Sequence, residues 1–189
     1  IITQKQKDFL VKSLLDKKNI LIVGGTSSGK TTFINGCINE LTETEDRVFL
    51  LEDTPELQCN ILNSVFLTTT HYVSMNMLLQ SSMRLNPDRI IVGELRRGEE
   101  TLELLKAWNS GHAGGLSTIH ANDCQSGLMK LEQYLAEVVA SDQTKTILEG
   151  VDIVVNLIKN EENKRVVREI KLLKDYDENK KEYVLEEIA

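Results

Sequence analysis

A run of glycine, hydroxyl and lysine residues at positions 24–32 carries the clearest chemistry in the sequence. Gly24 and Gly29 are separated by four residues, Lys30 and Thr31 follow, and a short apolar run comes directly before. Glycines let the backbone curl so that its N–H groups point at a polyphosphate, and a helix that starts here adds its positive end. The pattern therefore predicts a phosphate-binding loop between a buried strand and a helix.

Two side chains of this loop have the chemistry to bind more than the backbone does. Lys30 supplies a mobile positive charge for the terminal phosphates, and the Thr31 hydroxyl suits the shell of a magnesium ion that already holds phosphate oxygens and water. The residues expected to bind the phosphates are Gly25, Thr26, Ser27, Ser28, Gly29, Lys30, Thr31 and Thr32.

Polar residues also follow the other predicted central strands, at the point where each strand ends. In an α/β sheet of parallel strands, ligands bind beyond the carboxyl ends of the strands, so these residues should face one crevice together with the loop. The strands and the residues that follow them are 47–51 with the acids Glu52 to Glu56, 89–93 with Glu94, and 116–119 with His120.

These residue types match the parts that nucleotide hydrolysis requires. Glu94 suits the outer shell of the magnesium ion, through water, and either Glu56 or Glu52 could position the attacking water. Donors for the γ-phosphate are His120 and one of Arg84, Arg96 and Arg97, although each arginine could equally form a surface ion pair. His112 is either an incidental loop residue or one whose contacts change with the nucleotide.

The remaining periodicity predicts a single domain in which helices alternate with strands and antiparallel strands close the chain. The further helices expected are 4–17, 30–41, one capped by Ser74, one from Glu99 to Gly111, one capped by Asp123, and a short one capped by Ser141 that ends at Gly150. The further strands expected are an edge strand at 65–69, a hairpin of 151–158 with 165–173, and a short strand at 183–185.

Composition limits the classes of partner. The chain has 189 residues and a formal net charge of -7, which suits one domain with a sizeable core and gives no broad footprint for nucleic acid or an anionic membrane. The three cysteines are widely separated, so they predict neither a disulfide framework nor a zinc site, and a reducing cytosol fits best. The apolar runs are too short to span a bilayer, so any membrane contact should be peripheral.

With these residues in view, the chain resembles the secretion ATPases of the VirB11 type, most closely the TrbB-like conjugal-transfer branch. The resemblance covers about residues 18 to 160 and lies in four boxes in the family's order. The boxes are Gly24 to Thr32, Leu51 to Leu57, Asn86 to Arg96, and Trp108 to His112 together with Thr118 to Asn122.

The resemblance implies a RecA-like P-loop NTPase core, with a mainly parallel sheet flanked by helices, that uses ATP and Mg²⁺. It implies that Glu56 activates water, that Glu94 is the Walker B acid, and that His120 senses the γ-phosphate, with Lys30 and Arg96 as further catalytic residues and Thr31 and Glu94 at the metal.

For the whole protein, the resemblance implies a homohexameric motor in the cytoplasm, peripheral at the inner membrane. It would work with other components of a secretion or conjugation machinery and show no sequence-specific binding of nucleic acid. Family members also carry an N-terminal domain, and residue 1 here is Ile, so we expect residues 1–189 to be a single RecA-like ATPase domain without that part.

The chain departs from the family's pattern at three positions. Ser27 stands where a glycine is usual, Asn86 replaces an arginine before the Pro-Asp pair, and Ala113 replaces a proline. A stiffer phosphate loop is expected at Ser27.

Other functions share parts of this pattern. A type II secretion or type IV pilus ATPase uses the same core, although the acidic box Glu52-Asp53-Thr54 favours the conjugal branch. A module that binds ATP to control assembly, with little hydrolysis, would keep the loop without needing Glu56. A small-molecule kinase is the weakest alternative, because the sequence has no signature of an acceptor pocket.

Overall fold

Short, uninterrupted apolar runs build the centre of the molecule, because a strand that is covered on both faces needs no polar alternation. The computed structural model describes residues 2–188, in which every residue of the four central strands is buried. These strands are β1 (Ile20–Gly24), β2 (Val48–Glu52), β4 (Arg89–Val92) and β5 (Leu116–Ile119). The remaining strands are β3 (Ser64–Thr68), β6 (Ile153–Lys159), β7 (Arg165–Asp177) and β8 (Glu182–Glu187).

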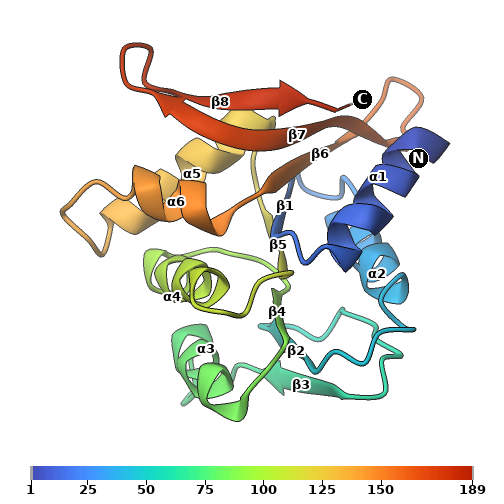
Figure 1. The fold of residues 1–189 in the computed structure, drawn as a ribbon, viewed down its shortest axis with the longest axis vertical. Helices are drawn as coiled ribbons and strands as arrows, with labels where there is room; N and C mark the ends of the chain where they lie inside the picture. Colours follow the sequence, from blue (N-terminus) through green and yellow to red (C-terminus); the bar gives the residue numbers. More distant parts are fainter. Residues whose placement is uncertain (1, 189) are drawn as a thin grey trace.

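One sheet of eight strands holds the fold together, in the order β3-β2-β4-β5-β1-β6-β7-β8 (Figure 1). The strands from β3 to β6 run parallel, whereas β7 and β8 are antiparallel to their neighbours. The expected mainly parallel sheet with antiparallel C-terminal strands is thus confirmed, and β3 is the edge strand predicted at 65–69.

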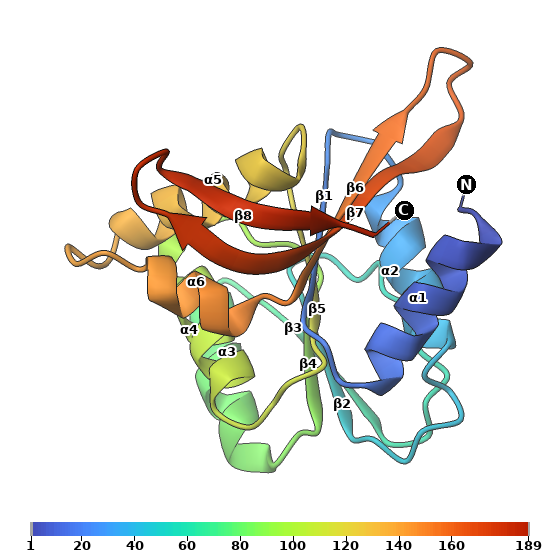
Figure 2. The ribbon, with the colours of Figure 1, turned by 45° about the horizontal axis from the view of Figure 1, so that its top comes forward.

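Helices cover both faces of the sheet. The helices are α1 (Gln4–Leu15), α2 (Lys30–Asn39), α3 (Met75–Ser82), the 3₁₀ turn η1 (Met83–Leu85), α4 (Gly98–Asn109), α5 (Cys124–Ala136) and α6 (Thr144–Gly150). Helices α1 and α2 pack on one face, and α3 to α6 pack on the other (Figures 1 and 2). Alternate residues of β1 serve the two cores: Ile20 and Ile22 face α1 and α2, while Leu21 and Val23 face the opposite helices.

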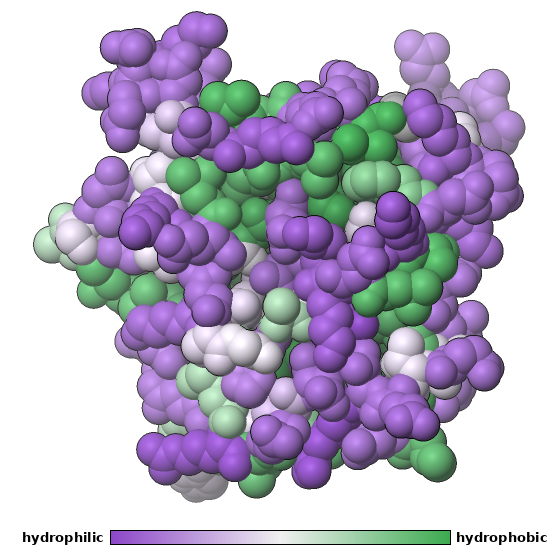
Figure 3. Space-filling view, viewed as in Figure 1, coloured by the Kyte–Doolittle hydropathy of each residue, from purple (hydrophilic) through white to green (hydrophobic). Residues whose placement is uncertain are grey.

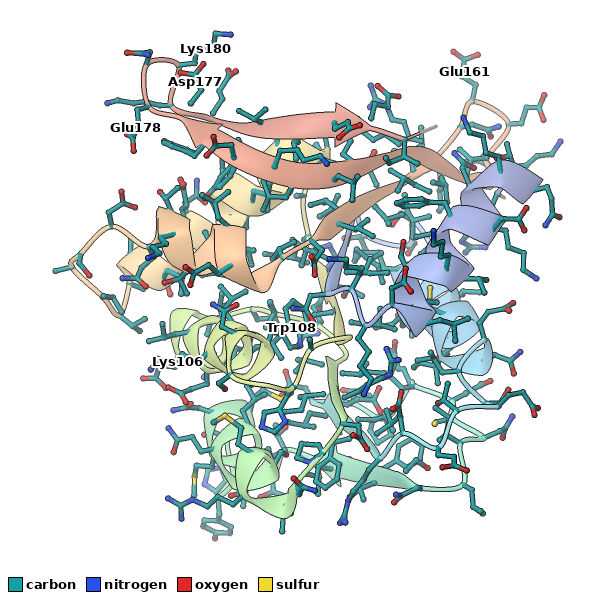
Figure 4. All side chains as sticks on the ribbon, in the orientation of Figure 1. Lys106, Trp108, Glu161, Asp177, Glu178 and Lys180 are labelled. Carbon is teal, nitrogen blue, oxygen red and sulfur yellow. The ribbon has the colours of Figure 1, made fainter. Side chains whose placement is uncertain are left out.

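Close packing of α4 against the sheet explains the glycine at the start of β5. Trp108 lies between α4 and the sheet, where its indole Nε1 donates a hydrogen bond to the carbonyl of Ile90 at 3.2 Å (Figure 4). A Cβ atom at Gly115 would collide with that indole nitrogen, so a larger residue would displace Trp108.

A buried arginine joins several elements at the amino ends of the strands. Arg89 is only 1% exposed, and its guanidinium pairs with Asp46 at 2.5 Å. It also donates to the carbonyls of Leu14 at 2.8 Å and Gly114 at 3.1 Å. These contacts tie the end of α1 and the loop before β5 to the start of β4. They lie at the amino ends of the strands, opposite the phosphate loop.

The C-terminal strands form a curved ribbon across one end of the molecule. The turn between β6 and β7 projects beyond the sheet near α1 and carries Glu161 at its tip, and the β7–β8 turn carries Asp177, Glu178 and Lys180 (Figures 2 and 4). Both turns are hydrophilic, whereas hydrophobic side chains gather beneath the β7–β8 ribbon on the face shown in Figure 3. Within residues 2–188, no helix has the length and apolar character needed to cross a bilayer.

Some element boundaries differ from the sequence predictions. Ser74 and Asp123 cap their helices as expected, but the cap predicted at Ser141 is wrong, because α6 begins at Thr144. Asp142 accepts hydrogen bonds from the backbone N–H and the hydroxyl of Thr144 instead. Strand β7 continues to Asp177, beyond the predicted end at residue 173, because β8 pairs with this polar extension.

Candidate active site

A polar cleft of about 430 Å³ opens at the carboxyl ends of the central strands. It collects residues that follow four separate strands, so the convergence predicted from the sequence is confirmed. The residues that line it are Thr26 to Thr32, Glu52, Asp53, Thr54, Glu56, Leu57, Gly93, Glu94, Arg96, Thr118, His120 and Arg165. Gly25 contributes a backbone carbonyl to the same region.

Backbone conformation shapes the loop between β1 and α2. Gly29 caps α2 with φ of +96°, a left-handed conformation that favours glycine, and no side chain caps this helix end. The N–H groups of the first turn therefore face the cleft without a side-chain acceptor. Ser27 also adopts a positive φ of 60°, which costs a residue with a Cβ more than it costs glycine.

Lys30 points back over the loop and is held by three acceptors. Its ammonium donates to the carbonyls of Gly24 at 2.8 Å and Gly25 at 3.1 Å, and lies 3.2 Å from Nδ1 of His120. Burial lowers the pKa of Lys30, and the nearby charge of Glu94 opposes that effect. The loop thus holds a cation whose present partners are mostly neutral.

His120 and Arg96 both contact the carboxylate of Glu94. Nε2 of His120 lies 2.7 Å from Oε1 of Glu94, and Arg96 donates to Oε2 through Nε at 2.7 Å and Nη2 at 2.6 Å. Arg96 also reaches Asp53 at 3.4 Å, and its hydrogen bonding to Glu94 raises the pKa of the guanidinium. A continuous chain of polar contacts therefore runs from Lys30 through His120 and Glu94 to Arg96.

The two acids of the loop after β2 have different environments. Glu52 is buried, and its Oε1 accepts hydrogen bonds from the backbone N–H groups of Glu56 at 2.9 Å and Leu57 at 2.8 Å. Glu56 is exposed in the cleft, where Oε2 accepts a hydrogen bond from the Thr31 hydroxyl at 3.1 Å. Of the two acids considered for positioning water, Glu56 has the exposed carboxylate, whereas the carboxylate of Glu52 holds the loop in place.

Residues available for a metal ion are few and are all oxygen donors. Among residues 2–188, the side chains of His, Cys, Asp and Glu form no group of three that could hold a metal ion. The hydroxyl of Thr31 and the carboxylate of Glu94 both line the cleft. This sparse donor set fits Mg²⁺, which keeps several waters and takes most other ligands from phosphates.

Three residues considered as site candidates lie away from the cleft. Arg97 precedes α4 and lines a neighbouring surface cavity, and Arg84 lies in η1, which leads into the start of β4. His112 lies at the amino ends of the strands, where its Nδ1 is 2.9 Å from the carbonyl of Pro87, and it is not part of the cleft lining. Residues just before a parallel strand lie at the opposite edge from those that follow it.

The structure also adds site residues to which the sequence analysis assigned no role. Asn35 on α2 donates to the carbonyl of Glu56 at 3.1 Å and accepts from the N–H of Gln58 at 2.9 Å, which clips the acidic loop to the helix. The hydroxyl of Thr118 donates to the carbonyl of Gly93 at 2.8 Å. Arg165 reaches the cleft from β7.

Known proteins match both the sequence and the fold. The family model described as "Type II/IV secretion system protein" matches residues 2–182. A probable conjugal transfer protein TrbB from Sinorhizobium fredii is 45% identical over 168 residues, which cover 88% of this chain and 51% of the relative. The conjugal transfer protein TrbB from Rhizobium radiobacter is 44% identical over 181 residues, which cover 95% of this chain and 55% of the relative.

A solved structure agrees with these relatives. The VirB11 ATPase from the Brucella suis type IV secretion system, in complex with sulphate, superposes with a TM-score of 0.80 at 27% identity over 88% of this chain and 53% of that one. The predicted resemblance to VirB11-type, TrbB-like ATPases is therefore confirmed. The chain spans about half the length of the curated relatives it matches.

Proposed function

Because the chain belongs to the type II/IV secretion system protein family, we propose that it hydrolyses ATP to drive a type IV secretion or conjugal-transfer machine. The observation that carries this proposal is the contact of Glu56 with Thr31, which places a free carboxylate beside the phosphate loop. The identity of 44% and 45% to TrbB proteins favours conjugal transfer over a type II secretion or pilus system.

Each residue of the cleft has a role in this proposal. Backbone N–H groups at the start of α2 and Lys30 bind the phosphates, and Glu56 orients the attacking water. His120 and Arg96 stabilise charge at the terminal phosphate, after exchanging their contacts with Glu94 for contacts with the substrate. Thr31 and Glu94 would hold Mg²⁺, which supplies further positive charge to the phosphates when it is bound.

The assembly and its location follow from the same family membership. We infer that the protein acts as a homohexamer with other components of the secretion machinery, in the cytoplasm and peripheral at the inner membrane.

Phosphate release from Mg-ATP tests the proposed reaction in the full natural protein. Glu56→Gln should lower kcat by about a hundredfold or more, because an amide cannot accept a proton from the attacking water, while ADP affinity stays within about twofold. Equal rates in the wild type and the variant would instead support an ATP-binding assembly module.

A further inference from the structure

Arg165 reaches the phosphate loop from a distant part of the chain. It is the first residue of β7, and the turn after β6 brings it back to the loop, where its Nε donates to the carbonyl of Ser27 at 3.3 Å. Ser27 is the loop residue with a positive φ of 60°. The contact therefore holds the loop at the point where its backbone is least favourable.

The side chain of Arg165 also lies directly on the start of α2. A Cβ atom at Gly29 would come within 2.7 Å of Cδ and 3.4 Å of Nε of Arg165. Glycine at this position thus serves two purposes, because it permits the φ of +96° and leaves room for the arginine stem. Arg165 is packed onto the phosphate-binding end of the helix.

Two cavities meet at this arginine. The polar cleft is also lined by Glu56, Glu94 and His120. The second cavity, about 310 Å³, lies between α1 and α2 and is lined mainly by apolar side chains such as Leu10 and Val11. Arg165 lines both. A nucleotide has a charged phosphate tail and an aromatic base whose faces can pack against apolar side chains. With the terminal phosphates in the polar cleft and the base toward the second cavity, the α-phosphate would lie at this junction.

The charge of Arg165 is also uncompensated. Among residues 2–188, no carboxylate forms an ion pair with Arg165, whereas Arg96 on the same cleft is paired with Glu94 and Asp53. Its partner in the structure is a neutral carbonyl. An unpaired guanidinium at the wall of a phosphate cleft is suited to an anionic ligand.

We propose that Arg165 binds the nucleotide's α-phosphate, from the same chain as the phosphate loop, with the nucleobase directed toward the apolar cavity. In the structure the same side chain donates to the carbonyl of Ser27. This inference rests on the proposed function, and it deepens it by assigning a cation that contributes to affinity rather than to the chemical step.

Equilibrium binding of ADP and of Mg-ATP to the full natural protein tests the assignment by calorimetry. Arg165→Ala should weaken the binding of both nucleotides by about tenfold or more, as expected for a lost charge-assisted hydrogen bond. Arg165→Lys should recover part of the affinity because it keeps the charge. The matched control is Lys164→Ala, since Lys164 pairs with Glu162 at 2.6 Å and should leave both affinities within about twofold.

A neutral variant separates charge from a merely structural contact. Gln at position 165 can still donate to the Ser27 carbonyl but cannot neutralise a phosphate. If Arg165→Gln bound nucleotide like the wild type, or if Arg165→Ala weakened ATP alone, the α-phosphate assignment would be wrong. A wild-type protein that bound neither nucleotide would instead overturn the proposed function, so the two failures are distinguishable.

Discussion

Glu52 and Glu56 belong to one acidic loop, and their surroundings give them different work. The buried carboxylate of Glu52 accepts two backbone hydrogen bonds, from Glu56 at 2.9 Å and Leu57 at 2.8 Å, which fixes where the Glu56 side chain begins. Among residues 2–188, the Glu56 carboxylate accepts one side-chain hydrogen bond, from the Thr31 hydroxyl. We therefore regard Glu52 as a positioning residue for Glu56.

Replacing Glu52 tests this division. Glu52→Ala should cost ~2 kcal/mol of unfolding free energy, because the buried N–H of Leu57 and the part-buried N–H of Glu56 lose their acceptor, and it should also lower kcat. Glu52→Gln retains an amide oxygen that can accept both bonds, so it should keep most of the stability and activity. Urea unfolding and phosphate release check the pair, and similar losses in both variants would contradict a role through hydrogen bonding.

The cysteines give a chemical test of the packing at single residues. Cys37 is 6% exposed, and burial raises the pKa of its thiol to about 12, so little thiolate forms at pH 8. Cys124 is fully buried and also has a raised pKa, whereas Cys59 is only partly buried. Iodoacetamide at pH 8, followed by peptide mass spectrometry, should label Cys59 first. Early labelling of Cys37 or Cys124 would show that the two cores are less closed than described.

Helix α2 links the phosphate loop to the acidic loop through Asn35. Its amide contacts the carbonyl of Glu56 and the N–H of Gln58, so it acts as a two-point clip between a helix and a loop. The helix starts at the phosphate loop, and the acidic loop carries Glu56, the proposed water-orienting acid. Their relative placement therefore depends on this side chain.

Removing the clip should separate binding from turnover. Asn35→Ala is expected to lower kcat about tenfold, because Glu56 loses its fixed distance from the phosphate loop, and to leave ADP affinity within about twofold. The control is Asn39→Ala at the exposed end of the same helix, which should change neither quantity. A loss of ADP affinity equal to the loss of kcat would place Asn35 in nucleotide binding instead.

Local patterns were sufficient to predict the strands, most helices and the convergence at one edge of the sheet. A buried strand is visible as an apolar run, and the residues at its carboxyl end come next in the sequence, as for Ile20 to Val23 and the loop after them. Arg165 and Asn35 could not be predicted, because their contacts depend on the register of the β6–β7 hairpin and on how α2 packs beside the acidic loop.

At the scale of the molecule, the amino and carboxyl ends of the parallel strands have different roles. The carboxyl ends of the strands hold polar groups that exchange contacts with the substrate in the proposed function, such as the pairs that Glu94 makes with His120 and Arg96. The amino ends of the strands hold Arg89, which is buried and contacts Asp46, Leu14 and Gly114. These contacts of Arg89 form a rigid base at the amino ends of the strands. Such a base allows side chains at the carboxyl ends to exchange partners without loss of the fold.

The Asp46–Arg89 pair gives the prediction that tests this rigid base. Asp46→Asn should cost ~3 kcal/mol at pH 7, because Arg89 remains charged, is 1% exposed and loses its counter-ion. The matched control is Glu149→Gln, which removes an exposed pair with Lys145 at 3.6 Å and should cost less than ~0.5 kcal/mol. Urea unfolding at several pH values provides both comparisons.

The pH dependence of the same variant follows from the direction of its pKa shift. Burial acts to raise the pKa of Asp46, but hydrogen bonds and charges from Arg89 and Lys17 outweigh it, so the folded pKa lies below the ordinary 3.8. The stabilisation is therefore present above pH 3.8 and is lost as the pH falls through the lower folded value. The gap in unfolding free energy between wild type and Asp46→Asn should stay constant from pH 7 to about 5 and narrow toward pH 3. A difference in unfolding free energy that did not depend on pH would mean that the charge of Asp46 does not hold Arg89 in place. The amino ends of the strands would then be stabilised by packing alone.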